Sequence, residues 1–399
     1  MRLNSGPAIL IVTSLLISIA GSIGCFARQA PPGPAARPTP SEPSPVASPS
    51  ATPPPTVTLA PTSTAQATVT VVSPGPTAIV TIPPTPRPVS LPADDAPHPD
   101  APTEWWYYNG RLEASGGRQF GFHFVVFVVR LAGFPPVRIA HFAITDGEKR
   151  VYAADQRAEL GPGNASPVDG FDFEVRGWRV AGSGGDDRLS AQVGEYTIDL
   201  DFASAKRPVL HGGTGSLDVS TAGQTSSYYS RTRMQARGAI STGAETTDVS
   251  GLAWFDHQWG NFSAPTIGWD WLAMQLDDGS DVMLYRMRDL STGDEFSYGT
   301  FVDLEGKASE LVRGDFEISS LDTWTSPVTG TKYPSGWAVE VPSRGIKLEA
   351  RPLVEASEFD ARVTTRNVYW EGLVRLTGSH SGWGFVELVG YGTPPTAPR

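Results

Sequence analysis

The stretch Trp269–Leu276, WDWLAMQL, is followed by the turn residues DDGS at 277–280 and then by DVMLYRMR at Asp281–Arg288. Two apolar runs of this length around an Asp-Gly turn predict a β-hairpin. Short runs divided by Gly-containing turns extend from residue 91 to the C-terminus, without a long run of helical period. The sequence therefore predicts an all-β chain of short antiparallel strands, which has to form a sandwich or barrel to bury its apolar faces.

Other segments predict the same kind of element. Phe120–Arg130 and Val137–Thr145 have the composition of neighbouring strands, and an Asp-Gly turn follows the second of them. Tyr196–Phe202 alternates apolar and polar residues, which places its apolar side chains on one face. Val368–Thr377 and Gly384–Tyr391 are predicted to form another antiparallel pair.

Two aromatic segments suggest an internal repeat. Trp105–Glu113 and Trp269–Asp277 align without gaps, with aromatic residues at the first and third positions and a Leu-acid pair at the end. Each is followed by a Gly-containing turn and a further strand. We therefore predict two modules of about 150 residues, enough for one barrel each. The loop-like segment Ser241–Thr247 places the predicted boundary between domains 92–245 and 246–399.

The N-terminal residues predict export and attachment to a membrane. Arg2 precedes the apolar run Ala8–Ala20, which ends before a single cysteine, Cys25. Residues 1–25 therefore predict a lipoprotein signal peptide with lipidation at Cys25, or alternatively an uncleaved signal anchor. Residues 26–91, rich in Pro, Thr and Ser, predict a disordered linker. Either alternative places the folded part outside the cytoplasm, anchored to the membrane.

Composition and missing motifs exclude several function classes. The formal net charge is −11, which disfavours a nucleic-acid partner because an acidic surface repels phosphates. One cysteine permits neither an internal disulfide nor a thiolate metal cluster. The sequence contains no G-x-S-x-G, H-E-x-x-H or Walker A motif. We therefore predict neither a cofactor nor a metal, and we disfavour a serine hydrolase or metallohydrolase.

Four stretches carry a resemblance to a known family. They are EWWY at Glu104–Tyr107, SGLAWFDHQWG at Ser250–Gly260, GWDW at Gly268–Trp271, and WEG at Trp370–Gly372 with a later Gly-Tyr pair. Together they resemble the hydroxyneurosporene synthase (carotenoid 1,2-hydratase)/AttH family. The resemblance covers about residues 94–391 and implies two tandem lipocalin-like antiparallel β-barrel domains. It also implies either addition of water to a C=C bond, a cyclase-like reaction, or a role beside ABC-type exporters.

The resemblance also implies site residues. Hydration of an isolated alkene requires an acid, a sheltered cation and a base that delivers water, and aromatic faces can stabilise such a cation. The family's hydratases suggest this work for His257 and Trp259. Asp256 and Tyr285 complete the predicted catalytic set, and a loop-anchoring role for the Asp-His pair is the alternative. Glu104 and Glu371 are predicted to be buried acceptors for indole N–H groups.

A wider set of residues is predicted to contact an apolar ligand in an aromatic-lined cup. It comprises Trp105, Trp106, Tyr108, His123, His141, Trp269, Trp271 and Trp370. Core or inter-domain packing is the alternative for the tryptophans, and satisfied core histidines are the alternative for the two histidines. The sequence therefore predicts a tethered protein that binds a lipid or isoprenoid and hydrates or cyclises it. The alternative is a non-enzymatic lipid-binding accessory of an ABC-type permease.

Overall fold

The computed structural model describes residues 87–218, 225–261, 267–290 and 292–392. Cys25, the apolar run before it and most of the predicted linker lie outside the described residues. Within the described part of the chain, no helix is long and apolar enough to cross a bilayer. The described residues form two antiparallel β-sheets and two short 3-10 turns, which confirms the predicted all-β class with two curled, lipocalin-like sheets.

The first sheet has the strand order β4-β3-β2-β1-β12-β11-β8-β7-β6-β5, and two short strands, β9 and β10, pair with β11. The strands at the two ends of this order contact each other, so the sheet curls toward a barrel. Its elements are η1 (Ala93–Asp95), β1 (Thr103–Ala114), β2 (Gln119–Val129), β3 (Val137–Asp146), β4 (Val151–Leu160), β5 (Phe171–Val175), β6 (Trp178–Ser183), β7 (Asp186–Val193), β8 (Tyr196–Ser204), β9 (Val209–Leu210), β10 (Ser216–Asp218), β11 (Thr225–Thr242) and β12 (Glu245–Gly260).

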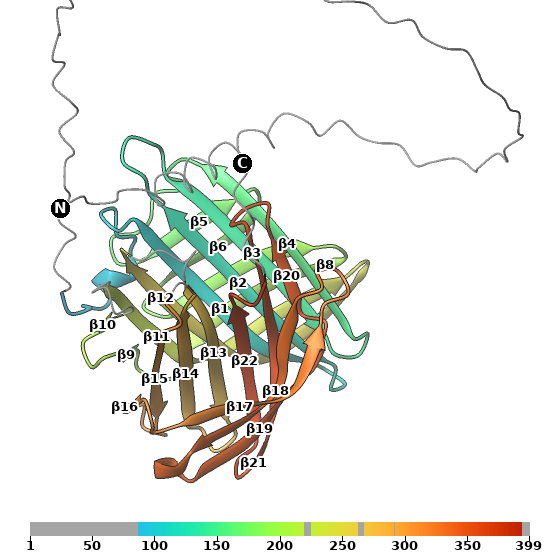
Figure 1. The fold of residues 1–399 in the computed structure, drawn as a ribbon. Helices are drawn as coiled ribbons and strands as arrows, with labels where there is room; N and C mark the ends of the chain where they lie inside the picture. Colours follow the sequence, from blue (N-terminus) through green and yellow to red (C-terminus); the bar gives the residue numbers. More distant parts are fainter. Residues whose placement is uncertain (1–86, 219–224, 262–266, 291, 393–399) are drawn as a thin grey trace, which may run out of the picture. The chain divides into compact units, whose positions relative to one another are not determined.

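The second sheet has the order β16-β15-β14-β13-β22-β21-β19-β18-β17, and β20 pairs with β21. The first sheet is drawn from blue to yellow and the second from gold to red in Figure 1. The elements of the second sheet are β13 (Ile267–Leu276), β14 (Asp281–Asp289), β15 (Glu295–Val302), β16 (Ala308–Val312), β17 (Glu317–Thr325), β18 (Lys332–Val341), η3 (Pro342–Arg344), β19 (Ile346–Pro352), β20 (Glu358–Ala361), β21 (Asn367–Gly378) and β22 (Gly382–Val389).

The predicted hairpins and the predicted repeat correspond to observed pairings. β13 pairs with β14, and β21 pairs with β22. In the first sheet the opening strand β1 lies between its hairpin partner β2 and the last strand β12. In the second sheet the opening strand β13 lies in the same way between β14 and β22. In each sheet, the aromatic opening strand therefore pairs on one side with its hairpin partner and on the other side with the last strand of the same module.

Two predicted boundaries need correction. β12 pairs along its length with β1 and β11, so it belongs to the first sheet, and the division between the sheets falls between Gly260 and Ile267 rather than at 245/246. The segment around Gly243 is only the hairpin turn between β11 and β12, because a turn and a domain linker share the same composition. The linker boundary at 91 is also too late, since Val89 is buried and its N–H donates to the carbonyl of Thr214.

Buried side chains pack inside each of the two sheets. Trp106, Tyr108, Phe122 and Trp178 are among the fully buried residues inside the first sheet. A second cluster fills the inner side of the other sheet, and a third, rich in aromatic residues, lies between the two sheets. Aromatic side chains therefore pack in both interiors, and the aromatic-lined cup for an apolar ligand stays a prediction.

Candidate active site

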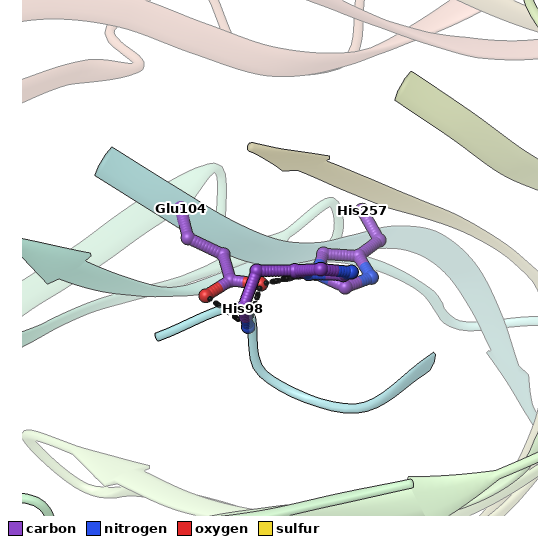
Figure 2. A group of neighbouring side chains, drawn as sticks. All are labelled: His98, Glu104 and His257. Atoms are coloured by element: carbon purple, nitrogen blue, oxygen red, sulfur yellow. Dashed lines mark hydrogen bonds and ion pairs between the residues drawn. The ribbon is translucent and has the colours of Figure 1, made fainter. Parts of the chain in front are cut away.

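A single buried carboxylate, Glu104 on β1, contacts two histidines (Figure 2). Its Oε1 lies 2.7 Å from Nδ1 of His98 and 3.0 Å from Nε2 of His257. Its Oε2 lies 2.9 Å from Nη2 of Arg130, and the backbone N–H of His98 donates to both oxygens at 3.0 Å. The carboxylate therefore accepts hydrogen bonds from two imidazoles and a backbone amide, and it forms an ion pair with a guanidinium.

This set of donors keeps Glu104 ionised. Burial by itself would raise the pKa of the Glu104 carboxyl, but the hydrogen bonds from His257 and His98 outweigh it and lower the pKa to about 2. An ionised carboxylate between two imidazoles accepts from whichever ring nitrogens carry protons. Glu104 therefore fixes the orientation of both rings and the tautomer of His257.

His257 is the buried partner in this site. It lies opposite Trp106 in the β1–β12 pairing, and the two rings stack with centroids 4.3 Å apart. Because its Nε2–H donates to Glu104, its Nδ1 carries the lone pair, and this atom is buried without a partner among the described residues. Burial lowers the pKa of His257, with Glu104 opposing, so the ring is a neutral proton acceptor at physiological pH.

His98 is the partly exposed partner, with 17% of its side chain accessible. Its ring stacks on Trp259 with centroids 3.9 Å apart, and its Nε2 lies 3.2 Å from Oδ1 of Asp94. Burial would lower the pKa of His98, but the hydrogen bonds to Asp94 and Glu104 raise it. A ring held between two carboxylates donates from both nitrogens, so His98 is an imidazolium and a potential proton donor.

The segment that carries His98 is tied into the first sheet by a buried ion pair. Asp95 in η1 is fully buried, and both its carboxylate oxygens lie 2.7 Å from Nη2 of Arg231 on β11. The hydroxyl of Tyr229 and the N–H of Gly184 also donate to Asp95. The indole N–H of Trp106 donates to the Asp95 carbonyl at 3.2 Å. These contacts fix the chain just before His98.

The same three residues are a possible set of metal ligands. One ligand atom from each of His98, Glu104 and His257 lies within 4.8 Å of the others. However, Glu104 Oε1 is in direct hydrogen-bonding contact with both rings, and the second oxygen is ion-paired with Arg130. Zinc–nitrogen bonds are about 2.0–2.1 Å long, so an ion would have to displace these hydrogen bonds. The observed contacts favour an acid–base site.

The structure separates the four residues of the predicted catalytic set. Trp259 lies beside His257, with ring centroids 4.7 Å apart. Asp256 points the other way, because successive side chains of β12 alternate between faces. Its carboxylate accepts from Tyr228 on β11 at 2.8 Å and from the indole N–H of Trp254 at 2.7 Å. Tyr285 lies in the cluster between the sheets, and its buried hydroxyl has no partner among the described residues.

The predicted ligand-contacting residues are also divided. Trp106 is in the site, and the hydroxyl of Tyr108 donates to Asp187 inside the first sheet. Trp105, Trp269 and Trp271 belong to the cluster between the sheets. Trp370 packs in the core of the second sheet, 5.5 Å from the ring of Trp337.

The two predicted histidines contact the second sheet rather than the barrel interior. Nδ1 of His123 lies 3.2 Å from Oε1 of Glu371, and His141 bonds to the hydroxyls of Tyr369 and Thr364. Both are buried, and burial lowers the pKa of each ring. His141 is a satisfied core histidine, which is the alternative that the sequence left open.

Sequence reasoning missed His98 and Arg130, and it assigned the wrong partners to two glutamates. Glu104 contacts two histidines, and Glu371 accepts from the hydroxyl of Tyr107. The carboxylates that accept from indole N–H groups are Glu387, from Trp269, and Asp256, from Trp254. His98 lies just after the predicted linker (26–91), in a segment of the first predicted domain that carries neither a motif nor the alternation of a strand. The available signal was its position six residues before the EWWY glutamate, within reach of the same carboxylate.

Two curled antiparallel sheets with a buried histidine–carboxylate site define a lipocalin-like β-protein of the tandem type. The sequence model of the AttH-like family matches residues 83–391, and the chain belongs to this family. No curated protein matches the chain at a significant level.

Two solved structures have the same fold. A candidate AttH protein from Nitrosomonas europaea is 28% identical, with a TM-score of 0.70, over 76% of this chain and 98% of that one. Kievitone hydratase from Nectria haematococca is 16% identical, with a TM-score of 0.60, over 76% of this chain and 94% of that one. The first likeness agrees with the family assignment, and the second shows the fold alone.

Proposed function

We propose that this protein is an acid–base enzyme that adds water to a C=C bond of an apolar small molecule, or performs a related proton-initiated cyclisation, at the Glu104 site. One observation carries the proposal: a single buried carboxylate contacts two imidazoles whose pKa values are shifted in opposite directions. Neighbouring groups with pKa values pushed apart are the arrangement from which acid and base roles are assigned.

The chemistry follows from the two rings. The His98 imidazolium gives its Nε2 proton to an alkene carbon, and the faces of Trp259 and Trp106 stabilise the carbocation that forms. Water then adds to the cation and loses a proton to Nδ1 of His257. The substrate gains H and OH across the double bond, and proton exchange with solvent through the exposed edge of His98 restores both rings. An apolar isoprenoid or polyene suits the aromatic surroundings, and the fold also serves a hydratase in kievitone hydratase.

The test is water incorporation by the purified full chain. An acyclic carotenoid and kievitone are incubated separately in ¹⁸O-labelled water, and mass spectrometry looks for a product heavier by one labelled water. His98→Asn and His257→Gln should each abolish that product, whereas His380→Gln, which removes a histidine on an exposed turn, should not. Product formation that survives both site substitutions would overturn the proposal.

The alternative is a non-enzymatic lipid-binding accessory of an ABC-type exporter. The predicted membrane attachment and long linker favour it, because a lipid-binding accessory has to extend from the membrane but does not require acid–base groups. Native mass spectrometry of protein purified from its own membrane separates the two proposals. A bound lipid that the protein never converts would support the accessory role.

We also propose that the chain is anchored outside the cytoplasm through lipidation of Cys25. The arrangement of a basic residue, an apolar run and a single cysteine supports this. Cys25→Ser should move the protein from the membrane fraction to the soluble fraction and abolish labelling by a radioactive fatty acid. If the variant stays in the membrane, the uncleaved signal anchor is supported instead.

A further inference from the structure

Three carboxyl groups lie at the junction between the two sheets. They belong to Asp256 on β12, Glu371 on β21 and Glu387 on β22. Asp256 and Glu371 are buried, and Glu387 is less deeply enclosed. The surrounding cluster contains aromatic and aliphatic side chains from both sheets. Buried carboxylates normally pair with a cation, so the partners of these three groups require an explanation.

The hydrogen-bond donors at the three carboxyls are neutral groups. Glu371 Oε1 accepts from the Tyr107 hydroxyl at 2.5 Å, across the junction from β1. Glu387 accepts from the indole N–H of Trp269 at 3.0 Å. Asp256 accepts from the hydroxyls of Tyr228 and Ser230 and from the indole N–H of Trp254. In the described ranges, no Lys or Arg forms an ion pair with any of the three.

Two of the three residues lie directly opposite each other on neighbouring strands. Glu371 and Glu387 are Cα partners in the β21–β22 register. Like charges at directly opposed positions destabilise a strand pair. The other titratable groups packed around them are His123, His141, Tyr152, Tyr369 and Tyr107. None of these supplies a positive charge at neutral pH, because burial lowers the pKa of both histidines and raises that of the tyrosines.

The protonation of the three carboxyls follows from this environment. Burial and the charge of Glu387 raise the pKa of Glu371 well above its ordinary value, and the Tyr107 hydrogen bond opposes this. Burial and the charge of Asp256 raise the pKa of Glu387 to about 7, with Trp269 opposing. Burial raises the pKa of Asp256 to about 6 against its three donors. The carboxyls are therefore neutral in acid and become charged as the pH rises.

We propose that the junction between the two sheets is a pH-sensitive latch, closed while Glu371 and Glu387 are protonated and weakened when they ionise. The latch shares its strands with the Glu104 site. On β1, Glu104 points into the first sheet and Tyr107 points to Glu371 at the junction. On β12, His257 points to Glu104 and Asp256 points to the junction. Loosening of the junction therefore acts on the two strands that hold the acid–base groups.

Thiol labelling tests the latch at one chosen position on each side of the second sheet. In a Cys25→Ser background the chain has no other cysteine. Ala273→Cys places a thiol in the junction cluster, and Ala350→Cys places one in the core of the second sheet. Labelling rates are divided by those of the denatured protein at each pH, which removes the titration of the thiol itself.

Between pH 5.5 and pH 8.5 we expect the protection of the Ala273→Cys thiol to fall at least tenfold, while that of Ala350→Cys changes less than twofold. Glu371→Gln with Glu387→Gln, which mimics the protonated pair, should abolish the fall. Should the double variant not fold, Glu387→Gln alone, at the less enclosed position, should reduce the fall severalfold. Equal loss of protection at both positions, no loss, or an undiminished loss in the Gln variants would each overturn the latch.

Discussion

Asp256 and His257 are adjacent in the sequence, but their side chains lie on opposite faces of β12 and serve different parts of the molecule. His257 Nε2 lies 3.0 Å from Glu104 inside the first sheet, whereas Asp256 accepts hydrogen bonds at the junction with the second sheet. The pair is therefore not a catalytic dyad. The partner of His257 is a glutamate 153 residues earlier in the chain.

The acid and base roles predict different effects for the two histidines. His257→Gln removes the proton acceptor, and we expect turnover of a converted substrate to fall by about 10²–10⁴-fold. His98→Asn removes the donor and should have an effect of similar size. Because apolar contacts supply most of the substrate affinity, binding should stay within a few-fold in both variants. Parallel measurements of kcat and of equilibrium binding check this, and a variant that loses binding but not kcat would contradict its assigned role.

The state of His98 predicts the pH dependence of activity. Its pKa is raised by Asp94 and Glu104, so the imidazolium persists above pH 6.5 and is lost as the pH rises through the folded-state value. Activity and the stability that this ion pairing contributes should both be present at low pH and decline on the alkaline side. Asp94→Asn should move the alkaline limb of the kcat/KM profile to lower pH, by roughly one pH unit or more.

The control for that shift is Asp100→Asn, which removes an exposed carboxylate from the same segment. It should leave the alkaline limb within about 0.3 units, as expected for a screened surface charge. Proton NMR of the histidine rings in each variant identifies which group titrates. An unchanged limb in Asp94→Asn would show that His98 does not control the rate.

The buried ion pair of Asp95 and Arg231 predicts a large stability effect. Arg231→Met leaves the Asp95 carboxylate without its cation, and the free energy of unfolding should fall by about 3–5 kcal/mol. Urea denaturation monitored by circular dichroism measures this change. The matched control is Arg188→Met, which breaks an exposed pair with Asp199 and should leave the free energy of unfolding essentially unchanged. Similar losses in the two variants would show that the buried pair does not anchor the segment.

The unpartnered hydroxyl of Tyr285 predicts a substitution without cost. Tyr285→Phe removes a buried hydroxyl that has no hydrogen bond among the described residues, so stability should be unchanged or should rise by about 1 kcal/mol. Turnover should also be unchanged, because the residue lies between the sheets rather than at Glu104. Tyr107→Phe, which deprives Glu371 of its donor, should instead cost about 1–3 kcal/mol. Loss of turnover in Tyr285→Phe would restore the catalytic role predicted from the sequence.

The sequence by itself determined the strands, the hairpins and the family. Alternating apolar residues predict which side chains share a face, and Asp-Gly turns predict where neighbouring strands reverse, because both signals act within a few residues. The alternation placed Tyr196, Ile198, Leu200 and Phe202 together, and all four are buried in the first core. The DHQWG motif pointed to His257 as a site residue, whereas Glu104 of the EWWY motif was predicted only as an acceptor for an indole N–H.

Only the tertiary structure decided which residues meet. The pairing of β1 with β12 brings Trp106 opposite His257 across some 150 residues of chain, and no local pattern specifies that register. His98 enters the site from a segment without periodicity, held by the buried Asp95–Arg231 pair. Asp256 and Tyr285, which the sequence placed in the catalytic set, lie instead at the junction between the sheets. The sequence could not predict this because it does not show that a second sheet covers the outer face of β12. Contacts between sheets depend on the packing of both modules, which is a property of the whole fold.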